Sequence, residues 1–205
     1  MLEDLETLKL YKKYLNTIQP VIDGYFSEQK EYIKCHKGCS KCCEYGAYPF
    51  YKIEFDYIMT GFFNLERTIQ ADVIKRIKML QKEYKNAKDK ENFMYRCPFL
   101  TQDNNCSIYE QRGLICRTFG LIIRNIENKV TLPFCFRNGL NYADVYDPET
   151  KKIDYENVKE KGYKTLPKVY KASLGILTNP EIFGGEGFDF GEVKPLIEWL
   201  TEISQ

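Results

Sequence analysis

The hydrophobic positions near the N-terminus repeat every three or four residues, which is the period of an α-helix buried along one face. The members of this stripe are Leu5, Leu8, Tyr11, Leu15, Ile18, Ile22 and Tyr25. Pro20 lies inside the pattern and lacks the backbone N–H that an interior helical residue donates. The sequence therefore predicts a helical scaffold over residues 1–34, as one long helix or as two helices joined at Pro20.

A second amphipathic pattern predicts a helix over residues 65–88. Its apolar positions are Ile69, Val73, Ile77, Leu80 and Tyr84. The densely charged run 82–91 is typical of a solvated helix end or of a patch on which a protein partner docks. The aromatic-rich stretch before this helix predicts a loop through Pro49 and a short helix over 51–60 that ends at Gly61.

Helical periodicity is weaker in the middle of the chain, where short helical turns are expected at 108–111 and 114–119. A β-hairpin is expected around Glu127-Asn128, because turn residues there separate two apolar stretches, 121–126 and 129–136. The turn residues Asp103-Asn104-Asn105 indicate a tight reversal. Near the C-terminus, the patterns predict helices over the following ranges: 166–177 and 191–204.

The chemistry of the chain concentrates in the stretch Cys35-His36-Lys37-Gly38-Cys39-Ser40-Lys41-Cys42-Cys43, which holds four thiols within nine residues. In a helix, Cys35, Cys39 and Cys42 would share one face. Gly38 and Ser40 are equally compatible with a turn or with the entry to a helix, and turns also bring thiolates together. Both geometries indicate a metal site rather than a ligand-free cysteine cluster, because exposed thiols that nothing holds oxidise readily.

Four more cysteines, at positions 97, 106, 116 and 135, bring the total to eight. The motifs Cys97-Pro98-Phe99-Leu100, Cys106-Ser107-Ile108-Tyr109-Glu110-Gln111-Arg112 and Cys116-Arg117 follow the first block in order. This pattern resembles the YkgJ-type cysteine cluster family, whose members are described as zinc- or iron-chelating proteins. The resemblance covers residues 35–137. It implies that all eight cysteines are metal ligands, namely Cys35, Cys39, Cys42, Cys43, Cys97, Cys106, Cys116 and Cys135. Gly113 departs from the family pattern, which usually has proline there.

We therefore expect a mainly α fold with a small irregular or β element around the metal site. A single compact domain, residues 1–205, would be stapled by a cysteine-ligated metal centre, because the free energy of metal binding becomes free energy of folding. Its parts would be the N-terminal scaffold 1–34, the cysteine-cluster core 35–137 and the C-terminal helical extension 138–205.

The net charge, the lack of long apolar runs and the cysteine content limit the classes of binding partner that we expect. The net charge of +1 provides no global field for nucleic acid or for an anionic membrane. No apolar run approaches the length of a membrane span, and the start Met1-Leu2-Glu3-Asp4 is unlike a signal peptide. Eight cysteines in such a chain favour metal ligation in a reducing cytosol over disulfides. The expected partner is thus a metal ion or cluster, in a cytoplasmic protein.

The spacing of the cysteines favours an iron–sulfur cluster over zinc. Structural zinc sites usually draw their ligands in close pairs, C-x2-4-C. The first block supplies such pairs, but the gaps after Cys97 are 8, 9 and 18 residues. An iron–sulfur core takes thiolates from several directions. Polynuclear zinc–thiolate sites also use adjacent cysteines such as Cys42 and Cys43, so zinc remains the alternative.

Basic residues near the thiols would offset the net negative charge of a thiolate-ligated centre. Arg112 and Arg117 are the predicted cofactor-binding residues, since both lie within the family motifs. Tyr109 and Glu110 would orient them or simply pack. His36, the only histidine, is expected to lie at the surface or beside the ligands rather than to bind metal.

Three functional classes follow. In the first, the chain is a binding or redox module whose centre carries electrons or is structural. In the second, it is an iron–sulfur-dependent, methyltransferase-like enzyme, because the flagellin lysine methylases look similar in carrying a related cysteine cluster. The chain has no glycine-rich cofactor loop after a strand to support that class independently. In the third, it is a metal carrier or sensor that releases its ion.

Overall fold

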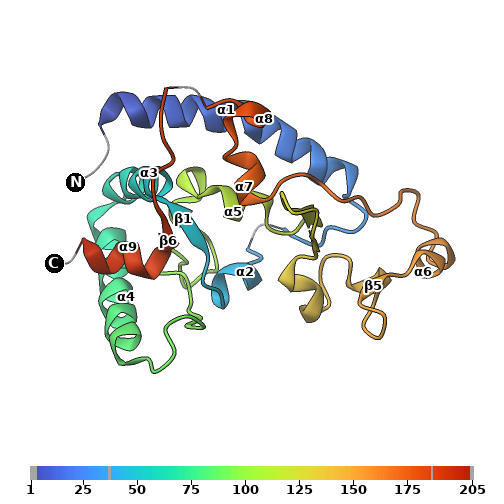
Figure 1. Ribbon diagram of the computed structural model, residues 1–205. Helices are drawn as coiled ribbons and strands as arrows, with labels where there is room; N and C mark the ends of the chain where they lie inside the picture. Colours follow the sequence, from blue (N-terminus) through green and yellow to red (C-terminus); the bar gives the residue numbers. More distant parts are fainter. Residues whose placement is uncertain (1–3, 37, 186, 204–205) are drawn as a thin grey trace. The chain divides into compact units, whose positions relative to one another are not determined.

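The computed structural model describes residues 4–36, 38–185 and 187–203, and these are mainly helical (Figure 1). The longer helices and those near the cysteines are α1 (Leu5–Glu28), α2 (Lys41–Glu44), α3 (Lys52–Phe63), α4 (Arg67–Asn86), α5 (Leu114–Thr118) and α9 (Leu196–Glu202). The shorter ones are η1 (Tyr109–Gln111), η2 (Phe134–Asn138), η3 (Ala143–Val145), α6 (Tyr155–Glu160), α7 (Leu174–Leu177) and α8 (Pro180–Phe183). The predicted mainly α class is thereby confirmed.

The strands of the described residues form three antiparallel pairs. They are β1 (Pro49–Tyr51) with β6 (Val193–Pro195), β2 (Ile123–Arg124) with β3 (Val130–Thr131), and β4 (Tyr146–Asp147) with β5 (Lys152–Ile153). The predicted small β element is therefore present as short pairs. Across the described ranges, no helix is long and apolar enough to cross a membrane.

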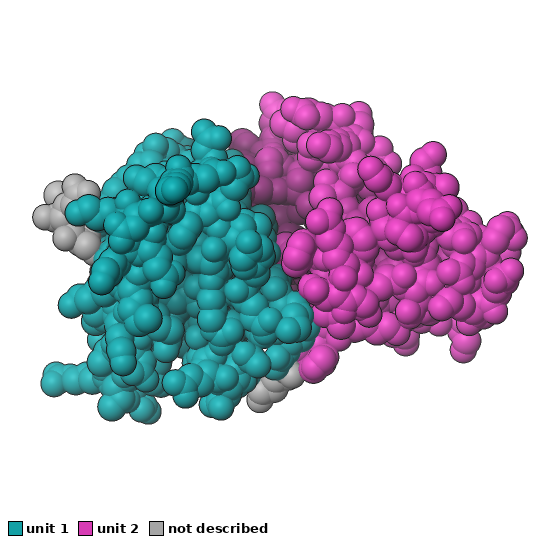
Figure 2. Space-filling model, turned by 90° about the horizontal axis from the view of Figure 1, so that it is seen from below, with its two compact units in different colours: residues 1–11, 37–116, 187–205 teal, residues 12–36, 117–186 magenta. Residues whose placement is uncertain are grey.

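The chain divides into two compact units (Figure 2). Unit 1 comprises the described residues within 1–11, 37–116 and 187–205, and unit 2 those within 12–36 and 117–186. These bounds interleave along the chain and differ from the predicted division at residues 34 and 137. The single domain spanning 1–205 stays a prediction.

Helix α1 is one continuous helix, which settles the choice left open at Pro20. Asp4 caps its start, where Oδ1 accepts hydrogen bonds from the backbone N–H groups of Glu6 and Thr7 at 2.8 and 3.0 Å. Because Pro20 has no N–H, the carbonyl of Asn16 loses its helical hydrogen-bond donor. Both residues lie on the exposed side of the helix. Water can bind that carbonyl, so the proline is tolerated.

The core of unit 1 lies between α3, α4 and α9. Trp199 of α9 donates its Nε1–H to the carbonyl of Phe50 at 2.8 Å, and its ring stacks on Phe55 with centroids 5.7 Å apart. Val73, Ile77 and Leu80 of α4 bury the apolar face that the sequence predicted. The β1–β6 pair, in which Phe50 lies opposite Lys194, closes this core (Figure 1).

The short helix predicted over 51–60 is longer than expected. Helix α3 continues through Gly61 to Phe63. A Cβ on Gly61 would lie 2.8 Å from Oε1 of Gln111. Contrary to the prediction, Gly61 therefore does not end the helix. Its missing side chain instead lets η1 approach α3 closely.

In unit 2, the predicted hairpin around Glu127-Asn128 forms from β2 and β3, with Asn128 in the left-handed region at φ 64°. The helix predicted over 166–177 is wrong except for its last turn, α7. Tyr170 instead pairs with the β2 region, where its N–H donates to the carbonyl of Ile122 at 2.9 Å. This pairing holds the segment in an extended conformation that Pro167 also favours.

The helix predicted over 191–204 is also shorter in the structure. It begins at Leu196, and Val193–Pro195 form β6 instead. The helix forms only after Pro195, which marks the boundary between the strand and the helix. Between the two predicted ranges, 166–177 and 191–204, Asn179 caps α8 by accepting the N–H of Glu181 at 2.9 Å.

Candidate metal centre

The first cysteine block enters a single helical turn rather than forming a helix from Cys35 onward. Gly38 has φ 88°, a left-handed conformation that glycine adopts without strain. The carbonyl of Ser40 then accepts the N–H groups of Cys43 and Glu44 at 2.7 and 2.9 Å, which starts α2. Of the geometries expected, the helix entry at Ser40 is the one observed. It places Cys42 and Cys43 next to each other, with their sulfurs 3.9 Å apart.

The end of the first cysteine block meets the start of the second in unit 1, although 53 residues separate Cys43 from Cys97. The N–H of Cys97 donates to the carbonyl of Cys43 at 2.8 Å. Gly46 and Tyr95 form an antiparallel bridge beside this bond, with N–H to carbonyl distances of 3.1 and 3.4 Å. Backbone pairing therefore brings the start of the second block alongside the first.

Cys106 and Cys116 reach the same region from two further segments. Cys106 follows the predicted reversal, in which Asn104 has φ 58°, and it bridges back to Leu100. Cys116 lies in α5, one of the predicted helical turns. The side chains of Cys97, Cys106 and Cys116 are partly buried against the core of unit 1.

The electrostatics show that four of these thiols lie near one another. Burial raises the pKa of Cys97 to about 12, and the charges that Cys106 and Cys42 would carry add to the rise. Burial first and then the charges of the other three raise the pKa of Cys116 well above its usual value. The pKa of Cys42 is raised by its hydrogen bond to the Cys43 thiol and then by burial. Burial and Cys42 also raise that of Cys106, which Arg112 partly offsets.

These thiols are close enough for their charges to interact, but they are not arranged as ligands of one ion. Within residues 4–36, 38–185 and 187–203, no three His, Cys, Asp or Glu side chains converge as a metal-binding group. The donor set nevertheless fits a thiophilic metal, because soft thiolates select zinc, copper(I) and iron–sulfur clusters. A bound cation would also relieve the mutual repulsion that disfavours the thiolates.

Glu54 is a residue that sequence reasoning missed. It lies in α3 and is fully buried. Its two carboxylate oxygens accept the backbone N–H groups of Leu114 at 2.6 Å and of Tyr51 at 2.8 Å. The first bond anchors the start of α5, and the charge of Glu54 contributes to the raised pKa of Cys116. A carboxylate between Ile53 and Phe55, in the aromatic-rich stretch, was the available signal.

The glycine at position 113 also has a structural reason. A Cβ there would lie 2.6 Å from the ring of Phe50 and 2.8 Å from Oε1 of Glu54. Both neighbours are buried, so they cannot move aside easily. The departure from the proline of the family pattern therefore accompanies the close packing of this segment on α3.

Cys35 and Cys135 belong to unit 2. Cys135 lies in η2 rather than in the second strand of the hairpin, and it is 4% exposed. Cys35 is exposed, and its Sγ accepts a hydrogen bond from Nδ2 of Asn141 at 3.2 Å. Both thiols are near enough to Tyr142 to contribute to its raised pKa, whose main cause is burial.

Asn141 organises the surroundings of Cys35. It is fully buried, its Nδ2 also donates to the carbonyl of Gly120 at 2.9 Å, and its Oδ1 accepts the N–H of Lys34 at 2.7 Å. Gly120 has φ 116°, and a Cβ on it would lie 2.9 Å from Nδ2 of Asn141. Asn141 lies outside the cysteine motifs, so no sequence motif pointed to it.

We expect Asn141→Ala to lower the free energy of unfolding by about 1–3 kcal/mol, because it removes the side-chain partner of the buried carbonyl of Gly120 and of the partly buried N–H of Lys34. Urea denaturation of the purified protein measures the loss. Asn92→Ala is the matched control, since Asn92 is exposed and bonds locally to Asp89. A loss no greater than that of the control would show that the Asn141 network contributes little.

The basic residues predicted to lie near the thiols belong to different units: Arg112 to unit 1, and Arg117 and His36 to unit 2. Arg112 donates to the carbonyl of Tyr109 at 2.7 Å, and its guanidinium stacks on that ring at 3.7 Å. Arg117 is buried in unit 2 and donates to Oε1 of Gln19 at 2.6 Å. His36 is exposed, with Nδ1 3.0 Å from the carbonyl of Lys34. Cofactor binding by Arg112 and Arg117 stays a prediction, as does the full set of eight ligands.

A mainly helical chain in which separate segments bring thiols together is typical of a cysteine-ligated metal-binding protein. The family model CxxCxxCC, described as "Putative zinc- or iron-chelating domain", matches residues 34–136. The chain belongs to this family, which confirms the resemblance seen in the cysteine motifs. Three residues separate Cys35 from Cys39 here, one more than the family name spells. No curated protein and no solved structure matches the chain.

Proposed function

We propose that the protein holds an iron–sulfur cluster on its cysteine thiolates and that this centre has a redox or structural role. The family match supports metal binding itself. The observation that carries the proposal is the electrostatic coupling of Cys42, Cys97, Cys106 and Cys116. These four thiols come from four separate stretches of chain, yet each lies within range of another's charge.

The preference for a cluster over zinc rests on how the ligands are supplied. After Cys97 no two cysteines are closer than 8 intervening residues, so the segment offers none of the close pairs that structural zinc sites use. A sulfide-bridged core is larger than one ion and takes thiolates from different directions. Cys43, whose sulfur is 3.9 Å from that of Cys42, is a further ligand in this proposal.

The protein's own groups would then set the properties of the centre. When bound, an iron–sulfur cluster supplies one-electron chemistry and a cross-link between its ligands. The core of unit 1, against which Cys97, Cys106 and Cys116 pack, would limit the access of water to them. Arg112, whose charge already favours the thiolate of Cys106, would offset part of the negative charge.

Metal and acid-labile sulfide analysis after anaerobic purification tests the proposal. We expect a coloured protein with iron and sulfide in about equal amounts, since both belong to the cluster core. Absorption in the visible region should fade on exposure to air or to a chelator. A colourless protein with stoichiometric zinc and no sulfide, even after anaerobic preparation, would overturn the iron–sulfur assignment and favour zinc.

A further inference from the structure

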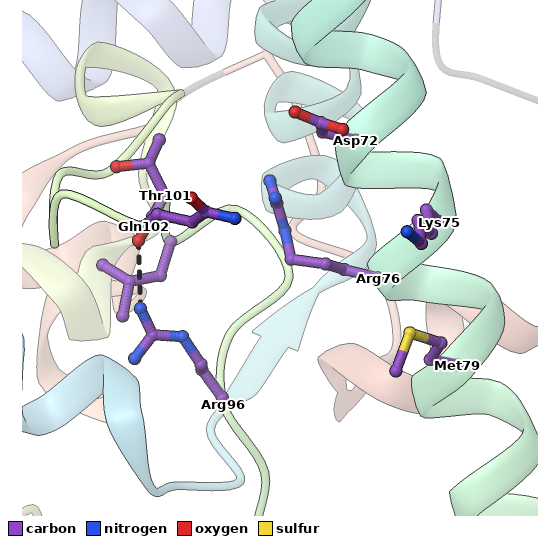
Figure 3. Close-up of a pocket in the computed structure, with 8 residues that line it drawn as sticks. Asp72, Lys75, Arg76, Met79, Arg96, Thr101 and Gln102 are labelled. Carbon is purple, nitrogen blue, oxygen red and sulfur yellow. Dashed lines mark hydrogen bonds between the residues drawn. The ribbon is translucent and has the colours of Figure 1, made fainter.

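A hollow of about 180 Å³ lies on unit 1 between α4 and the loop that follows Pro98 (Figure 3). Its polar lining consists of Asp72, Lys75, Arg76, Arg96, Thr101 and Gln102. The volume is the share that about six water molecules occupy in the liquid. A small ligand, rather than a polymer or a membrane surface, therefore fits this space.

The lining carries three cations and one carboxylate, which gives the hollow a net charge of +2. In the part of the chain that the structure describes, none of Lys75, Arg76 and Arg96 forms an ion pair within 4.0 Å, and the charge of Arg96 makes only a minor contribution to the lowered pKa of Glu44. Positive charges gathered in a concave site repel one another and attract an anion. An anionic ligand would relieve this repulsion. The net charge of the whole protein is only +1, so the positive charge of the hollow is a local feature.

Both guanidinium groups are held in place by backbone carbonyls. Nε of Arg76 donates to the carbonyl of Pro98 at 2.7 Å, and NH2 of Arg96 donates to that of Thr101 at 2.9 Å. In Figure 3, Arg76 extends from α4 towards the loop, and Arg96 reaches the same loop through its dashed bond. Arginine has five N–H donors, so each side chain keeps donors for a ligand after this anchoring.

We propose that this hollow binds the phosphate group of a small phosphorylated molecule. Two fixed guanidinium forks match the geometry of phosphate oxygens, and a dianionic phosphate ester balances the net charge of +2. The Oγ1 of Thr101 accepts the N–H of Asn105 at 3.1 Å, which leaves its hydroxyl proton to donate to a phosphate oxygen. Asp72 accepts a hydrogen bond from a hydroxyl on the organic part of the ligand.

The site adjoins the loop that carries Cys97. Arg96 directly precedes that cysteine, and Arg76 holds the carbonyl of Pro98 directly after it. A phosphorylated ligand would thus lie beside one of the candidate metal ligands. The inference itself does not depend on which metal is bound, because it rests on the charges and hydrogen bonds of the hollow.

Calorimetric titration of the purified, metal-containing protein with glycerol 3-phosphate and with inorganic phosphate tests the proposal. We expect saturable binding that is tighter for glycerol 3-phosphate. Arg96→Gln and Lys75→Gln should each lower the affinity for glycerol 3-phosphate about tenfold, because each removes a hydrogen bond from a charged donor. Lys78→Gln, on α4 but outside the hollow, removes the same charge and should leave binding within about twofold.

Lys75→Gln keeps the test decisive if Arg96→Gln fails to fold, because the exposed Lys75 side chain makes no hydrogen bond to other described residues of the chain. Absence of saturable binding to either probe would overturn the proposal. Equal weakening by Lys78→Gln would overturn it too, since it would show a general charge effect. Binding of glycerol 3-phosphate no tighter than that of inorganic phosphate would overturn the assignment to a phosphate ester.

Discussion

Removal of the metal should loosen the segment from Cys97 to Cys135 while α4 remains folded. Short turns and isolated bridges, rather than long helices or sheets, make up most of this segment. The free energy of metal binding to thiolates, about 10–16 kcal/mol for structural zinc, would then contribute directly to folding. Hydrogen exchange followed by mass spectrometry should show lost protection in this segment after chelation under reducing conditions.

Helix α4 provides the internal control for that experiment. Its buried face packs on α9, and Gln81 donates to the carbonyl of Leu200 at 2.6 Å. Peptides from 67–86 should therefore keep their protection. Unchanged circular dichroism and an unchanged melting temperature in the metal-free, reduced protein would contradict the expectation that metal supports the fold.

Replacement of Cys97 or Cys116 by serine should remove most of the bound metal, about as much as replacement of Cys39. A hydroxyl is a poor substitute for a thiolate towards thiophilic metals, and both thiols lie among the coupled group in unit 1. Metal content per protein, measured by plasma mass spectrometry on anaerobically prepared variants, gives the comparison.

Ser107→Ala is the matched variant for this series. Ser107 follows Cys106, and its hydroxyl donates to the carbonyl of Phe99 at 3.0 Å, so the change perturbs the same loop without removing a thiol. Its metal content should stay close to that of the unmodified protein. If metal loss were confined to variants of the first block, the later cysteines would be buried residues rather than ligands.

The elements that the sequence predicted well are those with a strong local signal. The apolar stripe of α4, from Ile69 to Tyr84, recurs over about four turns, and Asn128 adopts the positive φ that a tight hairpin requires. The meeting of the two cysteine blocks was also predictable, because the later thiols are too dispersed to form a centre alone. The first two inferences need only residues that are near one another in the chain, and the third follows from the chemistry of thiolate ligands.

The errors arise where distant segments decide the local conformation. Tyr170 lies in a stretch with helical spacing, but its backbone pairs with Ile122 and becomes extended. A glycine such as Gly61 often marks the end of a helix, but here it is required because Gln111 packs closely against it. Glu54 and Asn141 act through backbone groups 60 and 21–107 residues away, respectively. Their roles follow from tertiary packing, which no short window of sequence contains.

The pairing of β1 with β6 bears on where the chain can be cut. The family match ends at residue 136, whereas the partner of β1 and the whole of α9 lie beyond residue 190. A fragment limited to 34–136 would leave Phe50 without its strand partner and would expose the face of α3 and α4 that Trp199 covers. The segment that carries the family's signature is therefore shorter than the unit that keeps its thiols shielded from solvent.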